Sequence, residues 1–168
     1  KLDITEEVYY DIIKRKTASL IAAACGVGAA STTKNKEDVE KMKLFGKKIG
    51  IAFQIKDDLF DFGADDVGKP RGIDIKEKKM TLPLIYALNN ADKKTKKDII
   101  NTVKKHNEDS AKVAKVIAYV NQSGGIEYAT EAMYQYRQEA FDILHQFPES
   151  PARQALEDLV IFVTERKN

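Results

Sequence analysis

The first 69 residues of this chain contain no proline, and this absence constrains the fold more than any other feature of the sequence. The four prolines all come later, as Pro70, Pro83, Pro148 and Pro151. Because proline breaks the interior of a helix, a long proline-free stretch favours long helices. Strict alternation of apolar and polar residues, which is typical of strands, is hard to find along the chain. The sequence therefore predicts an all-α fold.

Apolar spacing and capping residues predict where these helices lie. We expect helices over residues 6–30, 36–62, 82–88, 93–105, 111–120, 126–147 and 151–166. Thr5, Thr81 and Ser150 are the expected N-caps of three of them. Small apolar residues fill positions 20–30, so the second half of the first helix is expected to lie in an interior. The helix over residues 36–62 is apolar on two sides and is expected to be central.

Composition and charge exclude several classes of protein. The net charge is +2, which argues against a strongly basic, histone-like protein. The lysine-rich helix over residues 93–105 lacks interleaved aromatic and arginine residues, so we expect no nucleic-acid binding. The single cysteine, Cys25, excludes an intrachain disulfide and indicates a reducing compartment, which predicts a cytoplasmic protein. The apolar runs are too short to span a bilayer, so no transmembrane segment is expected.

Three aspartates end the predicted helix over residues 36–62. Asp57 and Asp61 are four residues apart and face the same side, with Asp58 beside them and Gln54 one turn earlier. A cation would relieve the repulsion between these carboxylates, and Mg²⁺ typically binds one or two carboxylates together with water and phosphate oxygens. Acids at this spacing also arise by chance, and a run of acids is more often a solvated helix face. A metal-bridged phosphate site and a solvated face both remain open at this point.

A phosphate site would also need cations, and the segment after the aspartates supplies them. Residues 68–79 carry five basic and two acidic side chains, and their glycines let the backbone approach a ligand closely. Lys69 and Lys79 lie at the two ends of this segment. Lys16 and Thr17 form a second candidate pair, where the first helix changes from charged to small apolar residues. Lys16 either ends the solvated part of that helix or reaches into a polar cavity, and the sequence alone favours the first reading.

Three segments in this order resemble the trans-type polyprenyl diphosphate synthases. They are residues 53–61 (Phe-Gln-Ile-Lys-Asp-Asp-Leu-Phe-Asp), 68–74 (Gly-Lys-Pro-Arg-Gly-Ile-Asp) and 79–83 (Lys-Met-Thr-Leu-Pro). Residues 10–17 are similar to the Lys-Thr helix of this family, and residues 151–166 are similar to its C-terminal helix. The resemblance therefore extends over nearly the whole chain.

The resemblance implies a fold, a reaction and a set of site residues. The fold is a helical bundle around a large cavity, and the family is commonly dimeric, which implies a homodimer. The reaction is the head-to-tail (1′-4) condensation of an allylic diphosphate with isopentenyl diphosphate, assisted by Mg²⁺. Asp57 would bind Mg²⁺ directly, and Asp58 and Asp61 would complete the metal site. The allylic diphosphate would be held by Lys16, Thr17, Gln54, Lys69 and Lys79, and of these residues Lys16, Thr17 and Gln54 are also expected to act with Asp57 in catalysis.

The chain departs from the family pattern in one large respect. The family carries two aspartate-rich motifs, whereas this sequence contains one, and its neighbours identify it as the second. We therefore expect residues 1–168 to be the C-terminal segment of a synthase domain, inactive alone. Lys78 stands where many relatives have glycine, which leaves the register between Lys78 and Lys79 open. Two alternatives also remain open: a non-catalytic helical subunit and a class I terpene cyclase, although cyclases usually carry a different second metal motif.

Overall fold

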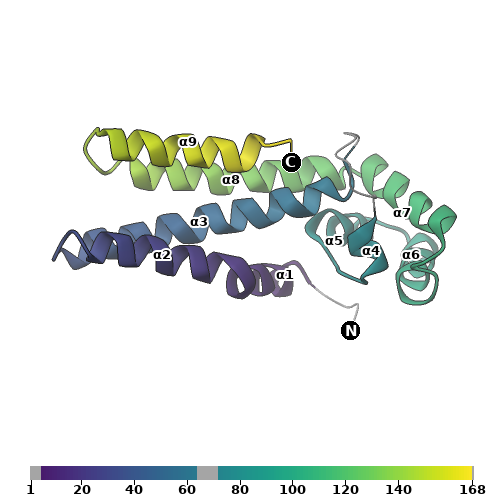
Figure 1. Ribbon diagram of the computed structural model, residues 1–168. Coiled ribbons are helices and arrows are strands. Elements are labelled where there is room, and N and C mark those ends of the chain that lie inside the picture. Colours follow the sequence, from purple (N-terminus) through teal and green to yellow (C-terminus); the bar gives the residue numbers. More distant parts are fainter. Residues whose placement is uncertain (1–4, 64–71, 168) are drawn as a thin grey trace. The chain divides into compact units, whose positions relative to one another are not determined.

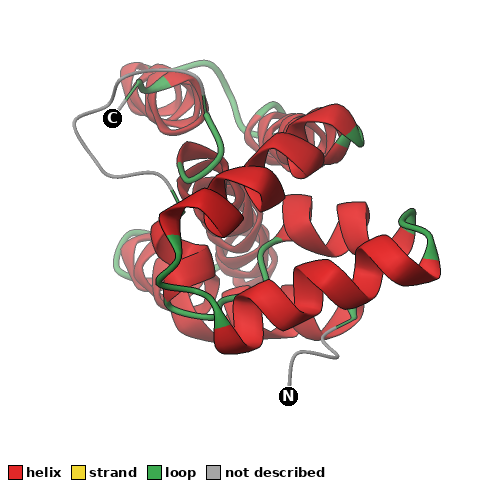
Figure 2. Ribbon diagram, turned by 90° about the vertical axis from the view of Figure 1, so that its right-hand side faces the viewer, coloured by secondary structure: helices red, strands yellow, loops and turns green. Residues whose placement is uncertain are grey.

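The computed structural model describes residues 5–63 and 72–167 of the chain (Figure 1). Every regular element within these residues is a helix, which confirms the all-α prediction (Figure 2). The elements are α1 (Glu6–Ile13), the π-helix η1 (Lys14–Ala18), α2 (Ser19–Ala30), α3 (Lys36–Phe60), α4 (Ile73–Lys76), α5 (Leu82–Asn89), α6 (Lys93–Lys105), α7 (Ser110–Gln122), α8 (Gly125–Leu144) and α9 (Pro151–Glu165). No helix in the described ranges combines the length and the apolar character needed to cross a bilayer.

The chain divides into two compact units. Unit 1 consists of Lys1–Tyr9 and Asp57–Thr130, and unit 2 consists of Tyr10–Lys56 and Glu131–Asn168. The divisions fall inside α1, α3 and α8, so these three helices each contribute to both units.

Unit 2 is built from long helices, and two of its glycines bring η1 and α2 close to α3. A Cβ atom at Gly50 would lie 2.6 Å from Ala18 Cα, and one at Gly46 would lie 2.6 Å from Ile21 O. Real Cβ atoms do not approach backbone this closely, so only glycine permits the contact. Gly50 is therefore a packing residue of α3.

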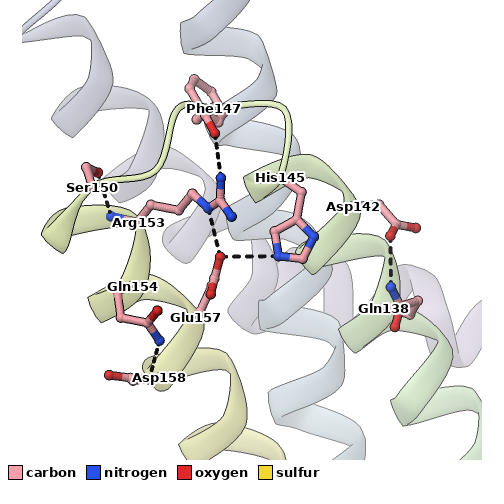
Figure 3. Close-up of polar contacts among 9 residues, drawn as sticks. All are labelled: Gln138, Asp142, His145, Phe147, Ser150, Arg153, Gln154, Glu157 and Asp158. Atoms are coloured by element: carbon pink, nitrogen blue, oxygen red, sulfur yellow. Dashed lines mark hydrogen bonds and ion pairs between the residues drawn. The ribbon is translucent and has the colours of Figure 1, made fainter.

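The turn between α8 and α9 in unit 2 is held by side chains of α9 (Figure 3). Ser150 Oγ accepts a hydrogen bond from Arg153 N at 3.1 Å, which confirms Ser150 as an N-cap. Arg153 Nη1 donates to Phe147 O at 2.8 Å, and Arg153 Nε donates to Glu157 Oε1 at 2.9 Å. His145 Nε2 lies 3.2 Å from the same Glu157 oxygen. These contacts fix the hairpin in which α8 and α9 lie side by side.

Unit 1 packs its shorter helices around a core that includes Ile75, Leu82, Leu84 and Val120. Caps start two of these helices. Asp92 accepts from Lys94 N and Thr95 N at the start of α6, and Asp109 accepts from Ala111 N and Lys112 N at the start of α7. The helix predicted over residues 93–105 coincides with α6.

Two expectations about helix ends have opposite outcomes. Thr5 Oγ1 accepts from Val8 N at 3.3 Å, which confirms it as the cap of α1. Thr81 precedes α5 with an extended backbone, but its side chain makes no capping hydrogen bond. Its hydroxyl oxygen is buried and has no hydrogen-bond partner among the described residues. Thr81 is thus the N-cap residue of α5, as predicted, but its side chain does not make the capping hydrogen bond.

The first predicted helix differs from expectation in continuity and in burial. Residues 6–30 are interrupted by the π-helix η1 between α1 and α2. Leu20 and Val27 are 73% and 70% exposed, and Gly26 is the buried residue of α2. The expectation of an interior helix is wrong for the described chain, because α2 packs on α3 along one face while these apolar side chains point elsewhere.

Candidate functional site

The π-helix η1 carries two of the predicted site residues, Lys16 and Thr17. Thr17 Oγ1 donates a hydrogen bond to Gln54 Oε1 at 3.0 Å within unit 2, and the Gln54 side chain is buried. Lys16 is exposed on the same turn. Single π-helical turns are rare and occur frequently at functional sites. The structure thus brings together Thr17 and Gln54, which the sequence places 37 positions apart.

The three aspartates at the end of α3 have different environments within unit 1. Asp57 is half-buried, whereas Asp58 and Asp61 are only 7% and 8% exposed. Asp58 Oδ2 accepts a hydrogen bond from the Tyr9 hydroxyl at 2.7 Å. Asp61 Oδ2 accepts one from Asp74 N at 3.2 Å. Asp58 and Asp61 therefore tie α3 to other segments of unit 1.

Burial raises the pKa of Asp61 to about 6, and the nearby charge of Asp74 adds to the rise. The backbone N–H groups of Asp74 and Ile73 and the charge of Lys79 lower the pKa of Asp61 again, but less strongly. A cation bound beside Asp61 would favour the ionised carboxylate and would oppose the effect of burial.

Lys79 lies close to these acids through Asp74. Its Nζ atom is 3.1 Å from Asp74 Oδ1 and 2.5 Å from Glu77 Oε2. The hydrogen bonds to Glu77 and Asp74 hold the pKa of Lys79 well above its usual range, so the ammonium stays charged. Lys78 has a left-handed backbone with φ of 59°. Of Lys78 and Lys79, it is Lys79 that contacts Asp74, the residue hydrogen-bonded to Asp61.

Lys69, the remaining predicted phosphate-binding residue, lies outside the described residues. Gly72, at the edge of the described segment, has φ of 74°. A Cβ atom there would lie 2.6 Å from Val113 Cγ1, so both its backbone conformation and its surroundings require glycine. Gly72 N donates to Asp61 O at 3.3 Å, so the segment from Gly72 to Asp74 lies next to the last of the three aspartates.

Two residues of the site were not assigned from the sequence. Asp74 donates its backbone N–H to Asp61 and accepts from Lys79, so it joins the last aspartate to the lysine. Tyr9 meets Asp58 from α1, 49 positions away. An acidic residue within a basic segment is a weak signal for Asp74. The sequence gives no signal for Tyr9, because its partner depends on how α1 packs.

The donor set at the end of α3 fits Mg²⁺ only in combination with a ligand. In the described part of the chain, no group of three or more acidic, histidine or cysteine side chains is arranged to hold a metal ion. Mg²⁺ usually takes one or two carboxylates and completes its octahedron with water and phosphate oxygens. Asp57 is the aspartate whose side chain is partly accessible, so it is the carboxylate best placed for this role.

Comparisons of sequence place the chain among known proteins. A family model described as polyprenyl synthetase matches residues 1–120. The short chain isoprenyl diphosphate synthase of Methanothermobacter thermautotrophicus is 38% identical, over 100% of this chain and 52% of the relative. The heptaprenyl diphosphate synthase component 2 of Geobacillus stearothermophilus is 33% identical, over 99% of this chain and 51% of the relative. The chain spans about half the length of the curated relatives it matches.

Comparisons of structure agree with those of sequence. The geranylgeranyl pyrophosphate synthase of Bacteroides thetaiotaomicron superposes with a TM-score of 0.90 at 40% identity, covering 99% of this chain and 55% of that one. The polyprenyl synthase of Caulobacter crescentus, solved with calcium and isoprenyl diphosphate, gives a TM-score of 0.91 at 30% identity, covering 100% and 52%. The family expected from the aspartate, glycine and lysine segments is confirmed, and this chain belongs to the polyprenyl synthetase family.

Proposed function

We propose that this chain contributes one half of the active site of a trans-polyprenyl diphosphate synthase. The substrates would be an allylic diphosphate and isopentenyl diphosphate, joined head to tail (1′-4). The observation that carries the proposal is the end of α3, where a partly accessible Asp57 lies beside two tied aspartates and Lys79 approaches through Asp74. Carboxylates for a divalent cation next to an ammonium for phosphate are what a metal diphosphate requires.

The reaction begins with cleavage of the C1–O bond of the allylic diphosphate. The electron pair leaves with diphosphate, the isopentenyl double bond attacks the allylic cation, and loss of a proton restores an alkene. Bound Mg²⁺ would supply charge neutralisation for the leaving group. Asp57 would hold this cation, with Asp58 and Asp61 maintaining the acidic wall behind it.

The remaining residues would bind the diphosphate oxygens. Lys79 and Lys69 are compact point charges that would stabilise the negative charge developing as the C–O bond breaks. Lys79 would exchange its contacts with Asp74 and Glu77 for phosphate oxygens. Thr17 would donate its hydroxyl hydrogen, oriented in the free protein by Gln54. Lys16, exposed on the same π-helical turn, would add a further positive charge.

Several properties of the whole protein belong to the same proposal. Residues 1–168 contain one aspartate-rich motif of the two expected, so we propose that they form the C-terminal segment of the synthase domain and do not catalyse prenyl transfer alone. We further propose a cytoplasmic homodimer that requires Mg²⁺. Sedimentation of the complete reading frame would test the dimer directly.

The decisive experiment uses the complete reading frame that contains this chain. The purified protein is incubated with an allylic diphosphate, isopentenyl diphosphate and Mg²⁺, and the products are identified by mass spectrometry. We expect products that grow by five-carbon units, and we expect Asp57→Asn to abolish them. Asp158→Asn is the matched control, because Asp158 lies on α9 and accepts from Gln154 at 3.0 Å on an exposed surface.

Two other outcomes would refute the proposal in favour of an alternative. A folded, metal-loaded protein that elongates nothing would point to a non-catalytic subunit. A cyclic hydrocarbon formed from the allylic diphosphate without isopentenyl diphosphate would point to a terpene cyclase.

A further inference from the structure

A buried tyrosine hydroxyl meets a buried carboxylate beside the candidate metal site. The Tyr9 hydroxyl donates to Asp58 Oδ2 at 2.7 Å, and the two residues are only 3% and 7% exposed. This distance is typical of a well-formed O–H···O hydrogen bond. Water has little access to either group, so loss of the bond would remove one partner from a buried carboxyl group. The contact is therefore a strong link between α1 and the end of α3 in unit 1.

The helix that carries Tyr9 is itself fixed within unit 1. Glu6 is three residues before Tyr9 and therefore lies on the same side of α1. Glu6 Oε1 accepts from the Tyr128 hydroxyl at 2.6 Å. The Tyr128 ring stacks on Tyr86, with ring centroids 4.4 Å apart. Tyr9 thus approaches Asp58 from a helix that is held at a second point one turn away.

Consecutive residues of a helix point in directions about 100° apart, so Asp57 and Asp58 cannot face the same way. Asp58 points into unit 1, where Tyr9 holds it, and Asp57 is half-buried. Asp58 could turn toward a cation only by giving up the hydrogen bond to Tyr9. The hydrogen bond from Tyr9 therefore keeps the Asp58 side chain turned into unit 1, in a direction different from that of Asp57.

We propose that Tyr9 is a positioning residue of the candidate metal site. Its hydroxyl holds Asp58 as an internal tie, and this tie orients Asp57 toward the metal diphosphate. Asp58 is accordingly a structural member of the aspartate motif and not a direct metal ligand. The proposal rests on the proposed function for the identity of the ligand, but its test does not require prenyl transfer.

The test measures metal binding directly, in the complete reading frame that contains this chain. Binding of Mn²⁺, as a spectroscopic substitute for Mg²⁺, is followed by electron paramagnetic resonance in the presence of inorganic pyrophosphate. Tyr9→Phe keeps the ring and removes the hydroxyl, and we expect Mn²⁺ affinity to fall about 10–100-fold, the range typical of groups that orient metal ligands. Tyr134→Phe is the matched control, because Tyr134 is exposed, and its ring contact with Arg137 is retained.

A second comparison keeps the proposal testable if Tyr9→Phe does not fold. Asp58→Asn retains a carbonyl oxygen that can accept from Tyr9, whereas Asp57→Asn removes the proposed ligand. We expect Asp57→Asn to weaken Mn²⁺ binding at least tenfold more than Asp58→Asn does. Equal losses in the two variants would overturn the proposal, since Asp58 would then act as a ligand.

Two further results bear on the role of Tyr9. Wild-type Mn²⁺ affinity in a folded but less stable Tyr9→Phe variant would show that Tyr9 is purely structural, and would overturn the proposal. Absence of Mn²⁺ binding by the wild type with pyrophosphate would overturn it as well. By contrast, tight Mn²⁺ binding that depends on Tyr9, in a protein that elongates no prenyl chain, would support the positioning role while refuting the proposed reaction.

Discussion

Replacing Asp61 by asparagine is expected to stabilise the fold at neutral pH, although it removes a carboxylate from the candidate metal site. Burial raises the pKa of Asp61 from its ordinary value of 3.8 to about 6. The native state therefore binds a proton on this group more tightly than the unfolded state does. As the pH rises from about 4 to about 6, the unfolded state loses its proton first, and the stability of the native state falls. Above about pH 6 the full cost of the buried charge is present.

The size of this effect follows from the pKa. A rise from 3.8 to about 6 corresponds to about 3 kcal/mol, at 1.36 kcal/mol for each tenfold change in proton affinity. The pKa of about 6 already includes the opposing charge of Lys79. Because the Asp61 side chain keeps some access to solvent, we take the usable part as about 1–2 kcal/mol. The asparagine carbonyl still accepts from Asp74 N, so the tie to the Gly72 segment is preserved. For a chain of this length the gain corresponds to a rise in Tm of about 2–8 °C.

The assay is urea unfolding of the wild type and of Asp61→Asn without divalent cations, at pH 4 and at pH 7.5. We expect the variant to be about 1–2 kcal/mol more stable at pH 7.5 and within about 0.5 kcal/mol of the wild type at pH 4. Asp92→Asn gives a contrast in sign, because hydrogen bonds from Thr95 and Lys94 lower the pKa of Asp92. An Asp61→Asn protein that is no more stable at pH 7.5, or whose gain is the same at both pH values, would refute the reasoning.

Three further predictions, which use four substitutions, test other parts of the structure. Gly50→Ala places a methyl group 2.6 Å from Ala18 Cα and is expected to lower the free energy of unfolding in urea by about 1–3 kcal/mol. Gly28→Ala is the control, because a Cβ there meets nothing within 4 Å, and it should raise the free energy of unfolding by up to about 1 kcal/mol. Equal effects of the two substitutions would contradict the packing argument. Lys78→Gly relieves a left-handed backbone and should raise stability by about 1 kcal/mol, and a loss of stability would show that the lysine side chain matters more than the backbone. Lys79→Ala in the complete reading frame should raise the KM for the allylic diphosphate at least tenfold, because it removes a charged hydrogen bond worth about 1.5–3 kcal/mol. An unchanged KM would show that Lys79 does not bind the substrate.

The helices could be predicted where local chemistry marks their ends. Asp92 caps α6 and Ser150 caps α9 through contacts within three residues, which a sequence displays directly. The π-helix η1 could not be predicted, because the residues that follow it, 20–30, are all apolar or glycine and show no periodicity in which one extra residue would be visible. The exposure of α2 could also not be predicted. The apolar composition of a helix shows that it can be buried, but it does not show which neighbouring segments cover it.

The candidate site was predictable in part for a related reason. The spacing of Asp57 and Asp61 is a property of one helix and appears in the sequence. Which of the aspartates stays accessible depends on contacts made by distant segments, such as the hydrogen bond from Tyr9 to Asp58. The hydrogen bond from Asp74 N to Asp61 likewise depends on the left-handed conformation of Gly72. A glycine in the sequence allows this conformation but does not show that it is adopted.

The glycines of α3 that contact η1 and α2 hold the helix backbones at a short, fixed separation. Where two helices meet through side chains, a change of rotamer can absorb a small displacement. At Gly46 and Gly50 the nearest atoms are backbone atoms of the neighbouring helix, which have no rotamer to change. Gln54 lies one turn beyond Gly50 and accepts from Thr17, so their side chains meet where these two backbones lie close together. Substitutions elsewhere in unit 2 that keep Gly46 and Gly50 are expected to leave this close approach of the backbones unchanged.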